Sequence, residues 1–433
     1  MPYPAGTRTD RDRSRRTSEI HQAKRHLDRF LCRRMCSELL CSHHRSLLEQ
    51  VTLGPLYINF YQHEGNGWWG RRTFLRKWRR IYADDQRWLP PYYPALVRAL
   101  QPGNEHLERL NAQPIYLEAL PRSQPRTERG QTSQMTPHGM MGSLMEEPVA
   151  ATVVMSDPRR RDRTGYLALL QVVNSQESLE RLLDSVLERL WKEGIARVIG
   201  PTGLTPHLQS GVLQNHFNSI PPLHTAYNPP YLPELMDRVM HPIQTTHLYH
   251  IDPATSVADQ PTTDLEIEAV DMVTSKQSIL SILEAVCDES ALFPAPDPAE
   301  LQFLLDWVGP GPLSGWIAHK NGQAVGAALV QPDGAGSFRR ARGGANPLWR
   351  MWLNWHTHRP TKAGRLLWAG VLPAWRRQGI GRALWAHLLA HARSQEWTTL
   401  SVGPLPQDST AARFLSGHGA APKQSYSIYA SSL

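Results

Sequence analysis

The sequence predicts an α/β protein made of two domains with similar outlines, and three observations support this fold class. The chain has 433 residues, whereas ordinary domains contain about 100 to 200. A polar stretch at 252–263 contains two prolines and divides the chain. On each side of it, a strand–helix–strand pattern ends in a Gly-Pro pair, at Gly200-Pro201 and at Gly403-Pro404. We therefore expect a duplicated α/β unit.

Each predicted unit follows from its hydrophobic pattern. Continuous apolar runs predict buried strands, and apolar residues that recur every three to four positions predict helices. The first unit comprises a strand at 166–173, a helix at 179–193 and a strand at 196–199. The second comprises a strand at 365–372, a helix at 381–394 and a strand at 398–402.

Composition shifts along the chain place the domain boundaries. We expect a basic, disordered arm at 1–45, a first domain at 46–251, a linker at 252–263 and a second domain at 264–433. Two further stretches lack periodicity and predict loops. They are a polar insertion at 121–147 and a basic, glycine-rich segment at 332–347.

The net charge of +8 raises the question of a nucleic-acid partner. Much of this charge lies in the arm. A second cluster, at 71–81, alternates basic with apolar residues at helical spacing, which predicts an amphipathic helix with a cationic face. We therefore do not expect nucleic acid as a partner, although contact through the arm and this helix stays an alternative.

Four cysteines in so long a chain fit a reducing compartment, and no apolar run reaches the length of a membrane span. We expect a cytoplasmic protein with no membrane partner. Neither Cys32, Cys36 and Cys41 with their neighbouring histidines nor the His387 and His391 pair has complete metal-ligand spacing, so no metal is expected.

The motif that carries chemistry follows the strand at 365–372. Pro373 ends that strand, and the segment Arg376-Arg377-Gln378-Gly379-Ile380-Gly381 leads into the next helix. A helix N-terminus has unpaired N–H groups and a partial positive charge, so a glycine turn there lets backbone amides approach a pyrophosphate. A plain structural turn is the alternative. The R-x-x-G-x-G pattern after a strand resembles the signature of GNAT acetyltransferases.

This resemblance implies two GNAT-like domains, each with a central mixed, mostly antiparallel sheet flanked by helices. In the second domain it extends over about 170 residues, with an early strand at 264–270, two helices within 275–307 and a hairpin that turns at Asn321-Gly322. It implies acetyl-coenzyme A as cosubstrate. The implied contacts with acetyl-coenzyme A come from Ala369, Gly370, Val371, Arg377, Gln378, Gly379, Ile380, Gly381 and Arg382.

The first half lacks the glycine turn. A shift of 203 positions places Gln176 and Ser178 where Gly379 and Gly381 stand, so we expect a degenerate partner domain that does not hold coenzyme A. The segments 82–91 and 227–231 nevertheless resemble parts of uncharacterised bacterial GNAT-like proteins.

The resemblance implies an N-acetyltransferase in which a primary amine, on a small molecule or a protein, attacks the thioester directly. The three positions that hold a Glu, an Asn and a Tyr in many family members hold Ser401, Asp408 and Leu415 here. Asp408 and Tyr426 are the replacement catalytic candidates, because both carry a group that transfers protons. An N-cap role for Asp408 and a packing role for Tyr426 are the alternatives. The alternative function is a non-catalytic sensory or regulatory module that binds coenzyme A. The sequence does not predict the acceptor or the oligomeric state.

Overall fold

The computed structural model describes residues 57–121, 146–256, 265–272, 274–287, 292–294 and 296–432. The predicted arm, the cysteine cluster and almost all of the 121–147 insertion lie outside these residues. Among the described residues, no helix is both long enough and apolar enough to cross a membrane.

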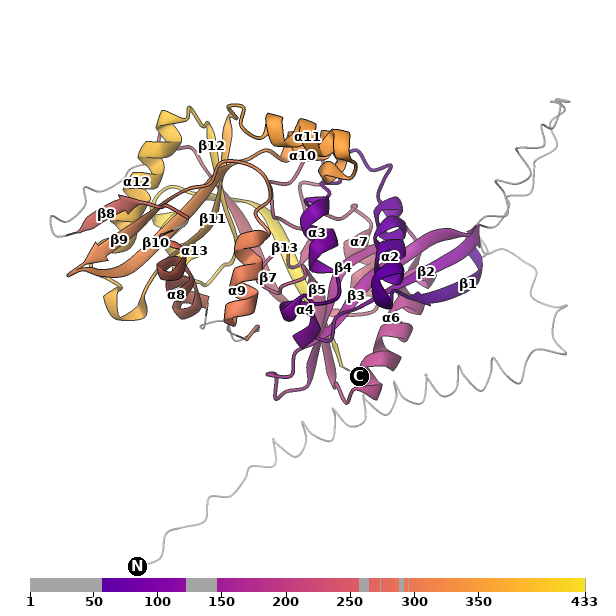
Figure 1. Cartoon of the computed structure of the whole chain (residues 1–433). Helices are drawn as coiled ribbons and strands as arrows, with labels where there is room; N and C mark the ends of the chain where they lie inside the picture. The colour runs from indigo at the N-terminus through magenta and orange to yellow at the C-terminus, as the bar shows by residue number, and fades with distance from the viewer. Residues whose placement is uncertain are drawn as a thin grey trace, which may run out of the picture. The chain divides into compact units, whose positions relative to one another are not determined.

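One 13-stranded sheet runs through the described chain (Figure 1). The first half supplies β1 (Tyr57–Glu64), β2 (Gln113–Pro121), β3 (Glu147–Ser156), β4 (Thr164–Val172), β5 (Arg197–Thr202), β6 (Val212–Leu213) and β7 (His241–Ile251). The second half supplies β8 (Glu266–Ala269), β9 (Ser314–Lys320), β10 (Gln323–Pro332), β11 (Ala363–Val371), β12 (Thr399–Pro406) and β13 (Ala421–Ser432).

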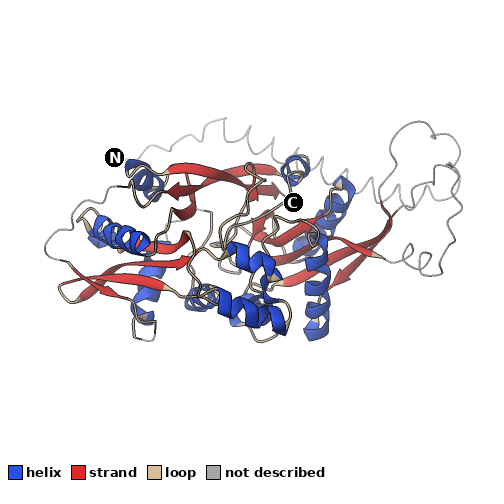
Figure 2. Cartoon of the chain, turned by 90° about the horizontal axis from the view of Figure 1, so that it is seen from above, coloured by secondary structure: helices blue, strands red, loops and turns tan. Residues whose placement is uncertain are grey.

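Helices flank this sheet, which Figure 2 shows from above. The first half contains α2 (Gly67–Ile81), α3 (Tyr93–Ala99), α4 (Glu105–Arg109), α6 (Gln176–Lys192) and α7 (Leu232–Asp237). The second half contains α8 (Lys276–Cys287), α9 (Pro298–Asp306), α10 (Ala335–Arg340), α11 (Pro347–His356), α12 (Ile380–Ser394) and α13 (Thr410–Gly417), with 3-10 turns η2 (Arg342–Gly344) and η3 (Pro373–Trp375). The predicted fold class is confirmed, because β4 with β5 and β11 with β12 are parallel pairs in a mostly antiparallel sheet.

The two halves exchange their last strands. The strand order is β1-β2-β3-β4-β5-β13-β7-β12-β11-β10-β9-β8, so β13 of the second half lies between two strands of the first. Strand β7 in turn pairs with β12, with Ser401 opposite His250. Tyr426 on β13 lies opposite Thr246 on β7. The halves therefore share a continuous backbone ladder.

An ion-pair network also joins the halves. Arg109, at the end of α4, places its Nε 2.6 Å from Asp297 Oδ2, at the start of α9. Arg159 Nη2 lies 3.4 Å from Glu300 Oε2, and Thr205 Oγ1 donates to Glu300 Oε1 at 2.7 Å. Because Glu300 is buried, these partners compensate the cost of burying its carboxylate.

Both predicted strand–helix–strand units are present, as β4-α6-β5 and as β11-α12-β12. The hairpin of β9 and β10 turns at Asn321 and Gly322, whose φ angles of 53° and 76° suit a tight two-residue turn. Helix α2 buries Phe74, Leu75 and Trp78, which confirms the predicted amphipathic helix.

The prediction of a loop at 332–347 was wrong. Helix α10 starts at Ala335, and η2 then leads to α11. Phe338 is only 2% exposed and packs in a small core with Leu89, Leu223 and Leu353. Packing against residues from other parts of the chain stabilises α10, although glycines lower its intrinsic helix propensity.

Candidate functional site

Strands β11 and β12 diverge at the centre of the second half. They pair in parallel from Ala363 to Arg365, opposite Thr399 to Ser401, and no further pairs join them in the described structure. A register shift in the pairing with β10 marks a bulge at Leu367. Beyond it, Ala369, Gly370 and Val371 keep β10 as a partner on one side only. The other edge of this backbone is therefore available to a ligand.

The predicted glycine turn lies beyond the end of β11 and opens α12. Gly379 is the N-cap residue in a left-handed conformation, with φ 82°, and no side chain caps the helix. Gly381 is exposed, and a Cβ built there would meet only Val371 Cγ2, at 3.9 Å. The first amides of an α-helix have no acceptor within the helix, and this is the arrangement that binds phosphate groups.

Cationic side chains surround this turn. Arg376 Nε donates to the Val371 carbonyl at 3.1 Å, which ties the turn to the end of β11. Arg377 is half-buried, and Arg382 is exposed. Lys320 Nζ donates to Gln378 Oε1 at 2.9 Å, so the end of β9 adds another positive charge. The sequence did not reveal Lys320, because a lysine before an Asn-Gly turn is an ordinary surface residue.

The comparisons agree with this geometry. Residues 280–419 match the sequence model of the Acetyltransferase (GNAT) family. A tandem GNAT protein from the clavulanic acid biosynthesis pathway, solved without AcCoA, has a TM-score of 0.51 and 12% identity, and the match covers 86% of this chain and 98% of that one. Residues 280–419 are thus similar in sequence to the GNAT family, and the chain has a fold similar to that of a tandem GNAT protein.

Other solved structures match with lower TM-scores. A GCN5-related glucosamine N-acetyltransferase region of a fungal multi-domain β-N-acetylglucosaminidase has a TM-score of 0.47 and 12% identity, over 88% of this chain and 39% of that one. A GCN5-related N-acetyltransferase from Anabaena variabilis has a TM-score of 0.44 and 8% identity, over 86% and 72%. The search of curated proteins found no match.

The two halves differ at the helix that connects the diverging strands. In the first half, Ser175 caps α6, and its side chain accepts a hydrogen bond from the Ser178 amide at 3.2 Å. Glu177 adds a negative charge in the same turn. A helix capped by its own side chain has fewer free amides for a phosphate group. Helix α12 has Gly379 at its N-cap, so no side chain of the cap residue competes with a phosphate group for the first-turn amides.

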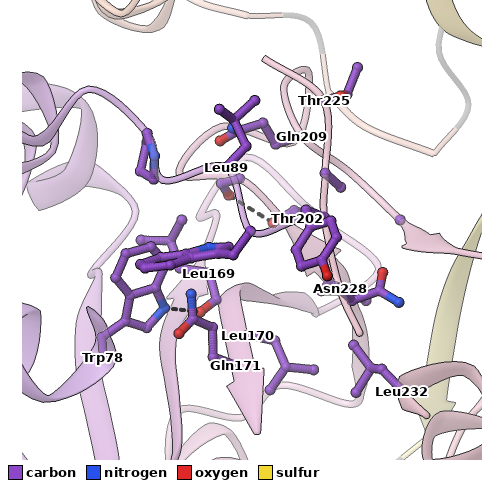
Figure 3. A pocket seen from close by; sticks show the side chains of 17 residues that line it. Trp78, Leu89, Leu169, Leu170, Gln171, Thr202, Gln209, Thr225, Asn228 and Leu232 are labelled. Carbon is purple, nitrogen blue, oxygen red and sulfur yellow. Dashed lines mark hydrogen bonds between the residues drawn. The ribbon is translucent and has the colours of Figure 1, made fainter. Parts of the chain in front are cut away.

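The first half contains a cavity of about 70 Å³ (Figure 3). It lies where β4 and β5 diverge, beyond the pairing of Ala168 with Thr202. Trp78 Nε1 donates to the Leu169 carbonyl at 2.7 Å and fixes one wall. The segments 82–91 and 227–231 supply further walls, through residues that include Trp88 and Asn228. These two segments, singled out by resemblance, thus line one cavity.

Arg365 lies where β11 and β12 part in the second half. We call this point the apex. The Arg365 side chain is buried, and Nε donates to the Leu223 carbonyl at 3.1 Å. The guanidinium also donates to the Gly403 carbonyl of β12. Burial lowers the pKa of Arg365 to about 10. Burial first, and then the charge of Arg365, lower the pKa of His224 to about 3. The apex therefore holds one fixed cation beside a neutral imidazole.

The catalytic candidates lie in different environments. Tyr426 is fully buried on β13, and its hydroxyl donates to Gln424 Oε1 at 3.3 Å. Burial raises its pKa, so the hydroxyl stays protonated. Asp408 is exposed in the turn before α13, and the N-cap of that helix is its neighbour Ser409. Leu415 is buried in the core of the second half, where it cannot donate a proton.

Two further placements concern metal-binding residue types. His391 on α12 packs its ring between Trp316 and Trp397, with centroid distances of 5.2 and 5.4 Å, instead of facing solvent. In the network between the halves, His106 lies close to Asp297 and Glu300. Arg109 and Arg159 already pair with those carboxylates, so the cluster is a set of ion pairs.

Proposed function

We propose that the second half binds acetyl-coenzyme A and transfers its acetyl group to a primary amine. The observation that carries this proposal is the uncapped N-terminus of α12, with Gly379 and Gly381 next to the diverging strands. The residues fit the ligand, because backbone amides at a helix N-terminus and nearby arginines complement a pyrophosphate. Acetyl-coenzyme A supplies the activated acetyl group.

In this proposal each part of the site has a separate task. The turn from Arg377 to Arg382 binds the pyrophosphate, and the free edge of Ala369 to Val371 holds the pantetheine arm by backbone hydrogen bonds. Arg365 supplies a fixed positive charge near the point where the strands part, which favours negative charge developing on a thioester oxygen. Tyr426 is the proposed proton donor to the leaving thiolate, and Asp408 the proposed acceptor of the amine proton, directly or through water.

A second candidate function is binding of coenzyme A without catalysis. It is favoured by Leu415, which occupies the position of the usual acid and lies in the core. It is also favoured by Arg365, whose guanidinium fills the apex and leaves a cavity of only about 10 Å³ beside it.

The test is calorimetric titration of acetyl-coenzyme A into the native chain and the Gly381→Glu variant. Gly381 has space around it and needs no positive φ, so the glutamate should leave the fold intact while it places a negative charge at the phosphate site. We expect at least about 100-fold weaker binding, because the glutamate side chain obstructs the approach of the phosphate to the backbone amides and its negative charge repels it. Gly336→Glu, at another open helical glycine, is the matched control and should bind normally.

Thiol release against a panel of amines then separates the two functions. Binding with turnover supports the acetyltransferase, and binding without turnover supports the sensory module. Equal affinity of the native chain and the Gly381→Glu variant would remove the site assignment.

A further inference from the structure

Helix α11 presents apolar side chains to solvent. Leu348, Met351 and Trp355 are 74%, 68% and 62% exposed. Their spacing of three and four residues places them along one face of the helix. Leu353, on another face, is fully buried and anchors α11 in the small core with Phe338. The exposed apolar face is therefore held rigidly on a packed helix.

Positive charge lies along the same stretch of the chain. Residues 334–362 contain five arginines and one lysine but no aspartate or glutamate. Within the α10–α11 segment, Arg340, Arg342, Arg350 and Arg359 are exposed. The Arg359 guanidinium lies 4.3 Å from the centre of the Trp355 ring, so charge and aromatic surface are adjacent. Lys362 differs, because its ammonium pairs with Glu396 at 2.8 Å.

We propose that α11 docks on an anionic lipid surface, with Leu348, Met351 and Trp355 at the level of the acyl-chain boundary and the arginines at the headgroups. Tryptophan and aliphatic side chains flanked by arginines are the composition of helices that lie in a membrane interface. This peripheral contact needs no membrane-spanning segment. The expectation of no membrane partner rested on the lack of such a segment.

Two other occupants fit the surface less well. Nucleic acid would use the arginines, but its phosphates offer no partner for exposed Leu348 and Met351. A second copy of the chain, joined by a two-fold contact through α11, would place the same arginines against one another. Like charges in such a contact repel.

The experiment measures co-sedimentation of the full chain with two kinds of vesicle. One contains phosphatidylcholine alone, and the other also contains roughly 30% phosphatidylglycerol, which makes its surface anionic. The triple variant Leu348→Ser, Met351→Ser, Trp355→Ser keeps every charge of the chain, including those of the N-terminal residues. Trp69→Ser is the matched control, because Trp69 is 75% exposed but belongs to α2.

We expect the native chain and Trp69→Ser to bind anionic vesicles, with little binding to phosphatidylcholine alone. The triple variant should bind at least about tenfold more weakly, and Arg350→Gln should weaken binding roughly fivefold. Absence of vesicle binding, or equal binding by the triple variant, would overturn the proposal. So would a dimer that the triple variant abolishes, or binding to duplex DNA that depends on the same three side chains. Circular dichroism and thermal unfolding confirm that each variant is folded.

Discussion

Replacement of Arg365 is the most informative test of how the apex is built. Two hydrogen bonds from a charged donor, to the carbonyls of Leu223 and Gly403, are together worth about 3 to 6 kcal/mol. Burial of the guanidinium acts against them. Its pKa falls to about 10, which corresponds to about 3 kcal/mol lost by the charged form. Arg365→Met removes both the bonds and the buried charge, so its net cost should be only about 0 to 3 kcal/mol.

Arg365→Lys should be worse than Arg365→Met. Lysine keeps the buried charge but lacks the planar fork that reaches two carbonyls at once. We expect the free energy of unfolding of the lysine variant to be about 1 to 3 kcal/mol lower than that of the methionine variant. Urea unfolding should measure this difference, with unchanged m-values. Arg359→Met and Arg359→Lys, at an exposed position, should each change stability by less than about 0.5 kcal/mol. If the lysine variant proves more stable than the methionine variant, the reasoning about the buried charge is wrong.

Three further predictions concern the same region. The pKa of His224 lies below its value of about 6.5 in an unfolded chain, so the neutral ring favours the fold at higher pH. The free energy of unfolding should therefore fall by up to about 1.4 kcal/mol per pH unit as the pH drops below about 6.5, and His224→Gln should reduce that slope in acid titrations. Gly364→Ala would place a Cβ 2.1 Å from the Trp397 ring, so it should destabilise the fold by about 1 to 3 kcal/mol in urea unfolding, and a neutral effect would contradict this packing. Tyr426→Phe should lower kcat and leave acetyl-coenzyme A affinity unchanged. Tyr429→Phe, on the same strand, is the control and should leave kcat unchanged. Full turnover in Tyr426→Phe would mean that Tyr426 has only a packing role.

Local patterns predicted the elements that depend on local physics. The apolar run and Pro373 located β11, and the Asn321-Gly322 pair located the hairpin. The two Gly-Pro pairs occupy equivalent places in β5 and β12, which agrees with the expected duplication. Each of these signals lies within about ten residues of the element it predicts, so one sequence is enough to read it.

Long-range features could not be predicted in this way. The exchange of β7 and β13 depends on pairing between strands some 180 residues apart, and the local sequence of neither strand indicates which strand it pairs with. Helix α10 was missed because the glycines of the 332–347 segment suggested a loop, whereas Phe338 finds its core partners, among them Leu353, only in the folded protein. Arg365 looked like an ordinary strand residue, since its partners come from β12 and from the first half.

The exchanged strands also bear on why the two halves stay in one chain. The apex of the second half depends on the first, because Arg365 donates to the carbonyl of Leu223 and because β12 pairs with β7. The first half depends equally on the second, since β13 completes its sheet beside β5. Each half therefore completes the sheet of the other, and removal of either would leave unpaired strand edges in the half that remains.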